Sequence, residues 1–151
     1  MEKEFIASIN KIIERDLNKL EDEINLYSSE ETIWKINGEI KNSGGNLCLH
    51  LCGNLQHFIG AILGKSGYVR NRDNEFAAKG VASRELVAEI LQTKEAVKSS
   101  LEKLDINILV QQYPVTVFNY SMTTTHFLIH LTAHLEYHLG QVNYHRRLLS
   151  N

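Results

Sequence analysis

The sequence predicts an all-α protein, a single domain over residues 1–151 that folds as a four-helix bundle. Apolar residues recur at three- and four-residue steps in four long stretches, the pattern of helices with one buried face. Two substantial connections separate these stretches, as helix bundles allow. Hydrophobic residues make up 43% of the 151 and charged residues 23%, a globular composition in a chain long enough to bury a core.

The first helix is predicted over residues 4–27, where eight apolar side chains share one face: Phe5, Ile6, Ile9, Ile12, Ile13, Leu17, Leu20 and Ile24. Residues 28–45 form a connector, in which three side chains are expected to pack: Ile33, Trp34 and Ile36. Residues 42–46 contain two glycines and are expected to break any helix. The second helix is predicted over residues 46–64.

A polar loop is expected over residues 65–82, followed by a third helix over about 84–104 with Ser83 as its cap. The buried side of this helix is predicted to hold seven residues: Leu86, Val87, Ile90, Leu91, Val97, Leu101 and Leu104. The pattern therefore places the third helix against the common core.

The last part of the chain is predicted to cross the bundle and then form the fourth helix. The only proline, Pro114, lies within residues 112–118, which we interpret as an extended segment with room for one short strand. Ser121 or a nearby threonine is expected to begin the fourth helix, which continues to about residue 149.

Composition excludes several classes of function. The formal net charge of −2 gives no basic excess, so neither nucleic acid nor an anionic membrane is an expected partner. No apolar run approaches membrane-spanning length, and the first residues lack the pattern of a secretory signal. Cys48 and Cys52 lie four residues apart, a poor disulfide framework. We therefore expect a cytoplasmic protein that acts on a small molecule.

Four of the seven histidines stand at every fourth position of the predicted last helix: His126, His130, His134 and His138. A helix turns about 100° per residue, so His134 lies about 40° from His138, while His130 and His126 drift to roughly 80° and 120°. The four rings cannot converge on one ion. His134 and His138 are best placed at the edge of the core, and the other two are expected on a solvated face. Glu136 lies on the far side of the helix from this pair, which excludes the general base of zinc proteases.

Three polar residues, His50, Asn54 and His57, share one edge of the apolar stripe on the predicted second helix. Histidines at positions i and i+4 can bind one ion, and a third histidine from a facing helix completes a three-histidine site. Such a site leaves an open position for water or substrate, which suits catalysis. The helix geometry leaves His50 and His57 as alternatives for the third ligand.

Several neighbours of these histidines have two interpretations. Gly53 and Gly60 either let another part of the chain come close or leave space above the site. Tyr137 and Gln141 either donate or accept hydrogen bonds that orient the metal ligands, or serve in packing.

Charged residues of the 65–82 loop also have two interpretations. Arg70 and Arg72 can bind an anionic substrate above the metal. Alternatively, they pair with Asp73 and Glu75 and hold the loop in place, which is the role we favour.

Two histidine motifs resemble those of the DinB/YfiT-like superfamily. The segment Leu-His-Leu-Cys-Gly-Asn-Leu over residues 49–55 resembles its helix-two motif, and residues 134–141 resemble its H-x-x-x-H-x-G-Q signature. Residues 70–76 further resemble one branch, and the resemblance spans about residues 46–147. It implies an up-down-down-up bundle. It also implies a divalent metal, nickel or zinc, held by His50, His134 and His138, and so favours His50 over His57.

The resemblance also implies an activity, because relatives include thiol-dependent transferases and a thiol-dependent isomerase. The expected function is a divalent-metal-dependent enzyme, a small-thiol S-transferase or a hydrolase, with a low-molecular-weight thiol as co-substrate. A homodimer is also expected, since family members are often dimers. The alternative is a non-catalytic binding or structural bundle whose histidines hold no metal. If the second and fourth helices run antiparallel, His57 falls opposite His130 and forms a second, weaker histidine pair.

Overall fold

The protein is all-helical in the computed structural model, which describes residues 1–149. The elements follow in the order α1 (Glu2–Leu26), α2 (Glu30–Ile33), α3 (Gly44–Leu55), the π-helical segment η1 (Gln56–Leu63), α4 (Arg72–Ala77), α5 (Ser83–Glu102), the 3-10 turn η2 (Ile106–Val110) and α6 (Thr124–Leu149). Residues 1–149 contain no β-strand, only two isolated antiparallel bridges, Asn37 with Ile40 and Gln112 with Thr123. The predicted all-α class is confirmed.

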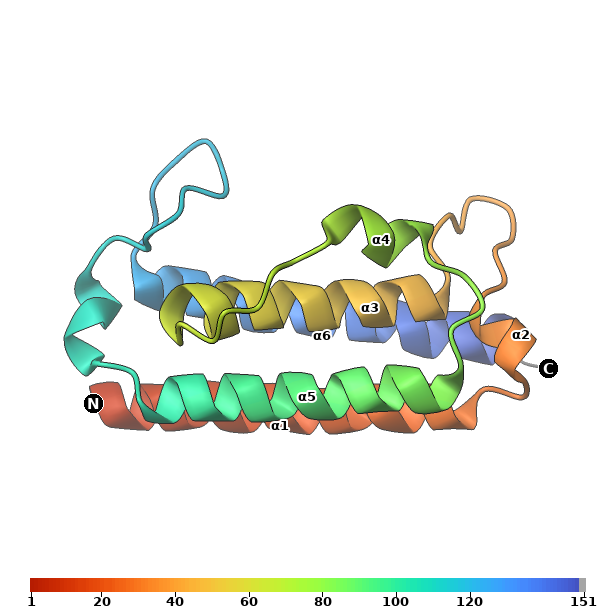
Figure 1. The fold of residues 1–151 in the computed structure, drawn as a ribbon, viewed down its shortest axis with the longest axis horizontal. Coiled ribbons are helices and arrows are strands. Elements are labelled where there is room, and N and C mark those ends of the chain that lie inside the picture. Colours follow the sequence, from red (N-terminus) through yellow and green to blue (C-terminus); the bar gives the residue numbers. More distant parts are fainter. Residues whose placement is uncertain (150–151) are drawn as a thin grey trace.

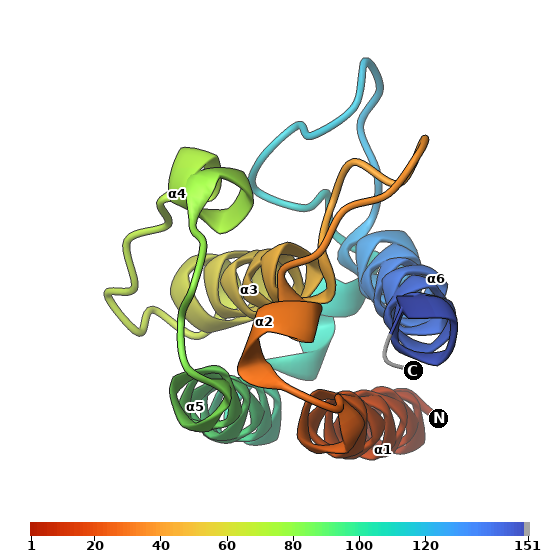
Figure 2. The same ribbon diagram turned by 90° about the vertical axis from the view of Figure 1, so that its right-hand side faces the viewer.

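Helix α1, helix α3 with its continuation η1, helix α5 and helix α6 lie side by side along the long axis of the molecule (Figures 1 and 2). In the end-on view, α1 and α5 form one layer, and α3 and α6 form the other (Figure 2). Three connecting segments rise from the outer face of the α3–α6 layer: the chain between α2 and α3, α4, and the loop of residues 111–123 (Figures 1 and 2). These segments therefore surround the face of the protein on which α3 and α6 meet.

The first helix forms as its apolar spacing predicts. Its two acidic residues in the first turn, Glu2 and Glu4, complement the partial positive charge of the helix N-terminus. One face is buried in the core through Ile6, Ile9, Ile13, Leu17, Leu20 and Ile24. The observed bounds agree with the predicted range to within two residues.

The connector between the first two long helices differs from the prediction. Residues Glu30–Ile33 form the short helix α2, whose first turn is capped by Ser29 Oγ accepting a hydrogen bond from the N–H of Thr32 at 3.2 Å. Ile33 is buried and Trp34 packs against the core, as expected. Ile36 is 64% exposed, so its predicted packing is wrong.

Two glycines begin helix α3, where the sequence predicted a helix breaker. Ser43 Oγ accepts a hydrogen bond from the N–H of Asn46 at 3.1 Å, which caps this helix. A Cβ on Gly44 would meet the hydroxyl of Tyr27, and one on Gly45 would meet the indole of Trp34. These residues are glycine because aromatic side chains from the connector pack directly on the start of the helix.

Helix α5 begins at Ser83, but Ser83 does not cap it. The first turn is closed by Glu85, whose carboxylate accepts a hydrogen bond from the N–H of Ala82 at 3.2 Å. The N–H and hydroxyl of Ser83 instead donate to the carboxylate of Glu30. Leu91 is 48% exposed, so its place on the predicted buried face is also wrong.

The last connection is a loop closed at its base. No strand forms over residues 112–118, although Tyr113 donates its N–H to the carbonyl of Met122 at 2.8 Å. Helix α6 is capped by Thr123, whose hydroxyl accepts a hydrogen bond from the N–H of His126 at 3.2 Å. The expectation that a threonine near Ser121 begins this helix is confirmed. None of the helices over residues 1–149 has the length and hydropathy that crossing a membrane requires.

Candidate metal centre

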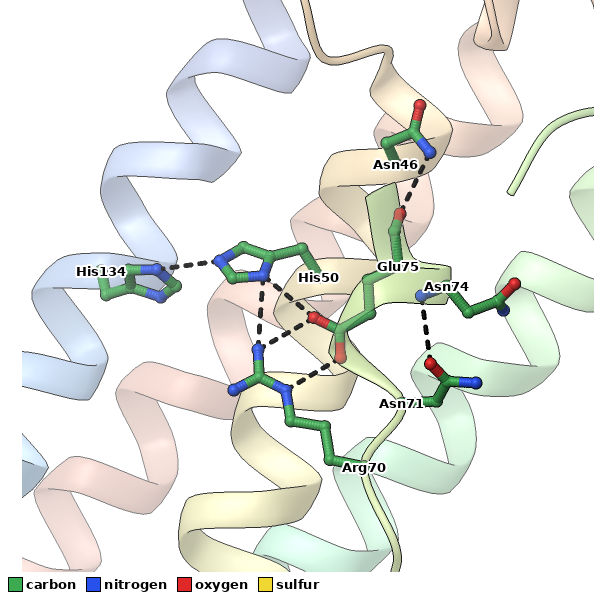
Figure 3. A network of polar contacts seen from close by, with 7 residues as sticks. All are labelled: Asn46, His50, Arg70, Asn71, Asn74, Glu75 and His134. Carbon is green, nitrogen blue, oxygen red and sulfur yellow. Dashed lines mark hydrogen bonds and ion pairs between the residues drawn. The ribbon is translucent and has the colours of Figure 1, made fainter. Parts of the chain in front are cut away.

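Three histidine rings from two helices converge between α3 and α6. His50 lies on α3, and its Nε2 is 3.2 Å from Nε2 of His134 on α6 (Figure 3). The ring of His138, one turn further along α6, is centred 4.6 Å from the His134 ring and 5.2 Å from the His50 ring. The structure thus brings together the three residues that the sequence and the resemblance selected.

The separation of their nitrogens fits one ion. One nitrogen from each ring lies within 4.8 Å of the others. In a tetrahedral site, two nitrogens bound at 2.0–2.1 Å to the same ion lie about 3.4 Å apart. Side-chain rotations that move each ring nitrogen by up to about an ångström therefore suffice to form a three-histidine site.

Hydrogen bonds occupy Nδ1 of two of the rings, His50 and His138, and leave Nε2 of each ring for an ion. Nδ1 of His50 donates to Oε1 of Glu75 at 3.0 Å, because an ionised carboxylate can only accept. Nδ1 of His138 donates to Oε1 of Gln141 at 2.6 Å. Each bond fixes the tautomer in which Nε2 carries no proton, the form that binds a metal.

Burial favours the neutral form of the two proposed ligands on α6, His134 and His138. It lowers the pKa of His134 to about 3, with further lowering from the charges of His138, His50, His130 and Arg70. Burial also lowers the pKa of His138, against the opposing effect of its hydrogen bond with Gln141. Both rings are therefore neutral at pH 7, so protons compete weakly with an ion for them.

Glu75 is buried on α4 and links this short helix to the site (Figure 3). Its carboxylate accepts two hydrogen bonds from Arg70, from Nε and from one terminal nitrogen, each 2.9 Å long. Burial alone would raise the pKa of Glu75, but hydrogen bonds from His50 and Arg70 lower it overall. The carboxylate is therefore ionised and balances the Arg70 guanidinium, which comes within 3.4 Å of Nδ1 of His50.

Two residues of α3 make room for Glu75 and anchor it. Asn46 donates from Nδ2 to the carbonyls of Glu75 and Ala78, at 3.0 and 2.9 Å, and so fixes α4 on α3. A Cβ on Gly53 would lie 2.0 Å from Oε2 of Glu75. Gly53 therefore lets another part of the chain, the Glu75 side chain, come close to α3, which is one of the two predicted outcomes.

Two buried polar atoms near these ligands lack a hydrogen-bond partner within residues 1–149: Nδ1 of His134 and Oδ1 of Asn54. Asn54 stands one turn along α3 from His50 and is 7% exposed. Such atoms are costly to bury unless something satisfies them. Their presence fits a site shaped for a further bound group.

The remaining candidate residues lie around this centre in different ways. Tyr137 is 66% exposed, and its ring meets the His138 ring edge-on, with 5.1 Å between the ring centres. Arg70 forms an ion pair with Glu75, which is the loop-holding role that we favoured. Arg72 instead lies over the ring of Phe76, 5.3 Å from its centre. Arg70 therefore acts through Glu75 and His50, and Arg72 packs on the aromatic ring that covers His50.

The other four histidines lie in four different environments. His126 is exposed, as expected, but His130 is half-buried and stacks on Phe127 instead of facing solvent. His145 is buried away from the centre, between the Tyr27 hydroxyl at 2.7 Å and the Lys35 carbonyl at 2.8 Å. His57 packs edge-on against Phe58, and its pairing with His130 stays a prediction.

Glu75 pairs with Arg70 of the same loop, as expected, and it also contacts His50, which the sequence did not predict. The sequence contains one hint that Glu75 matters. It follows Arg70 by five residues in a loop that resembles one branch of the DinB/YfiT-like proteins. No periodicity, however, indicates which helix a short loop helix contacts.

A comparison with protein families adds one finding to this geometry. The family model described as "Protein of unknown function (DUF1572)" matches residues 1–151. No significant match was found among curated proteins or among solved structures. With its whole length matched by that model, the chain belongs to the DUF1572 family.

Proposed function

We propose that this protein is a divalent-metal-dependent enzyme of the DinB/YfiT-like superfamily, with His50, His134 and His138 as ligands. The observation that carries the proposal is the convergence of these rings, with one nitrogen from each within 4.8 Å of the others. Nickel and zinc are the proposed ions, since imidazole suits both.

The course of the helices supports membership of this superfamily. Helices α1 and α6 run in one direction and α3 and α5 in the other, as an up-down-down-up bundle requires (Figure 1). The DUF1572 family is itself grouped with the DinB/YfiT-like proteins. The two histidine motifs lie on facing helices, as they do in the superfamily that the sequence resembles.

The side chains around the centre have distinct roles in this proposal. A divalent ion held by three histidines keeps an open position, where it lowers the pKa of water or of a small thiol. Glu75 orients His50 and supplies negative charge behind its ring. Gln141 orients His138, and Phe76 covers one face of the His50 ring, 4.8 Å from its centre.

We propose small-thiol transfer or hydrolysis as the reaction, on a small-molecule substrate. The net charge of −2 supports a small molecule over nucleic acid. Cys48 and Cys52 are buried free thiols, which supports a reducing, cytoplasmic environment.

Metal analysis of untagged protein, purified without chelator, tests the proposal. We expect about one divalent ion per chain, lost in His134→Ala and in His138→Ala and retained in the control His126→Ala, whose side chain is exposed on the same helix. Loaded protein is then assayed with a panel of cellular thiols. Wild-type protein without an ion, or an ion retained by both ligand variants, would favour a non-catalytic bundle.

A further inference from the structure

The loop of residues 111–123 presents apolar side chains to solvent beside the metal centre. It projects from the outer face of the α3–α6 layer, as the pale blue loop at the upper left of Figure 1. Four of its large apolar residues are at least one-third exposed: Val115 (40%), Val117 (38%), Phe118 (39%) and Tyr120 (58%). Single exposed apolar side chains are ordinary, but the rings of Phe118 and Tyr120 contact each other and so form one continuous exposed apolar surface.

This surface continues to the metal centre through a row of rings. The ring of Tyr120 stacks on Phe118, with centroids 6.1 Å apart and planes 20° apart. Phe118 in turn meets His130 edge-on, 5.0 Å between centroids. The next ring along α6 is His134, centred 6.1 Å from His130. Phe118 is thus two ring-to-ring contacts from a proposed ligand.

The loop is anchored at its base, so its tip has a defined position. Thr124 donates its N–H to the carbonyl of Gln111 at 2.9 Å. This hydrogen bond lies next to the backbone hydrogen bond from Tyr113 to Met122. The buried Tyr113 also donates its hydroxyl hydrogen to the carbonyl of Phe58 at 2.7 Å. These contacts fix the two ends of the loop against η1 and α6 and leave the side chains near its tip accessible.

We propose that Phe118 and Tyr120, together with the His130 ring, bind an apolar ring of the substrate while its polar end reaches the metal. Aromatic side chains bind a ring by burying apolar area and by stacking or edge-to-face contact. This inference rests on the proposed metal-dependent function and adds a substrate class to it, an organic molecule that carries a metal-binding group and an aromatic or similarly apolar ring.

Two ligands that differ only in their apolar part test this inference without requiring turnover. Acetohydroxamate and benzohydroxamate present the same metal-binding group, with a methyl or a phenyl attached. Each is titrated into cobalt-loaded protein, and binding is followed by the change in the visible cobalt spectrum. The variants are Phe118→Ala/Tyr120→Ala, the conservative Phe118→Leu, and the control Leu91→Ala, which removes an exposed apolar side chain from α5 in the opposite layer.

We expect benzohydroxamate to bind the wild-type protein about tenfold more tightly than acetohydroxamate. The double variant should reduce this ratio to within about twofold and leave acetohydroxamate binding unchanged, while Phe118→Leu keeps most of the preference and Leu91→Ala keeps all of it. Equal binding of the two ligands by the wild-type protein, or an unchanged ratio in the double variant, would overturn the inference with the metal site intact. A loop that instead forms an interface between two copies of this chain would show as dimer dissociation in the double variant, which also overturns it. Failure of cobalt to bind at all is a separate result, which overturns the metal-dependent function itself.

Discussion

The carboxylate of Glu75 accepts a hydrogen bond from Nδ1 of His50 at 3.0 Å, across 25 residues of sequence and between two helices. The opposite nitrogen of the same ring faces His134 at 3.2 Å. An acidic side chain therefore stands behind a proposed metal ligand, an arrangement common in histidine metal sites. Removing or displacing this carboxylate should weaken metal binding without removing any ligand.

Glu75→Gln is expected to weaken metal affinity by about tenfold or more. The amide can still accept a hydrogen bond, but the charge that balances Arg70 is lost, and that guanidinium lies 3.4 Å from the His50 ring. Competition with a fluorescent chelator measures the affinity.

Asp73→Asn is the matched control for Glu75→Gln, because it removes an exposed carboxylate from the same short helix. Its metal affinity should equal that of the wild-type protein. Equal weakening in both variants would mean that Glu75 acts only through the net charge of α4, and not through its contact with His50.

Gly53→Ala is expected to displace Glu75, because the added Cβ would lie 2.0 Å from Oε2 and 2.7 Å from Cδ of that residue. Metal affinity should fall about as far as in Glu75→Gln. The gain in helix propensity, about 1 kcal/mol, offsets part of an overpacking cost of about 1–3 kcal/mol. The free energy of unfolding should therefore fall by no more than about 2 kcal/mol.

Gly140→Ala on α6 serves as the control for that substitution, since its added Cβ would meet nothing within 4 Å beyond the neighbouring backbone of its own helix. It should raise the free energy of unfolding by up to about 1 kcal/mol and leave metal affinity unchanged. Urea denaturation and chelator competition on both variants separate the two effects. Wild-type metal affinity in Gly53→Ala would show that the position of the Glu75 carboxylate does not matter.

The stability of the metal-free protein should decrease in mild acid because of His134. Its pKa is lowered to about 3 by burial first and by neighbouring charges second, whereas an unfolded histidine titrates near 6.5. Between these values the unfolded chain binds a proton that the folded chain does not, so the free energy of unfolding falls as the pH drops from about 6.5 towards 3. Between pH 6.5 and 5 the loss attributable to this ring is about 1 kcal/mol, after allowance for the water around a half-buried side chain.

Urea denaturation at pH 7 and pH 5, with chelator present, measures this loss. His134→Asn replaces the titrating ring with a neutral polar side chain and should lose less stability over the same interval. Parallel pH profiles for the wild-type protein and the variant would contradict the proposed burial of a neutral imidazole.

Much of this architecture could be predicted from helical periodicity alone. The angular positions of His134 and His138 placed them at the edge of the core, and the two rings are centred 4.6 Å apart. The same spacing selected Ile13, Leu17 and Leu20 of the first helix as core residues, and all three are buried. These predictions succeeded because they depend on neighbours within one regular helix.

Features that depend on contacts between distant segments could not be predicted in this way. Gly44 and Gly45 begin a helix because Tyr27 and Trp34 pack on them, although two glycines in isolation indicate a loop. Leu91 fits the apolar spacing of α5 but remains 48% exposed. The approach of Glu75 to His50 likewise depends on how a short helix docks, which no local pattern records.

Binding of one ion by the three histidines is tested by anomalous scattering from a crystal of the untagged protein grown with zinc. We expect one peak between α3 and α6, about 2.0–2.1 Å from a ring nitrogen of each of His50, His134 and His138. Absence of a peak there, or three rings that diverge around packed apolar side chains, would contradict it.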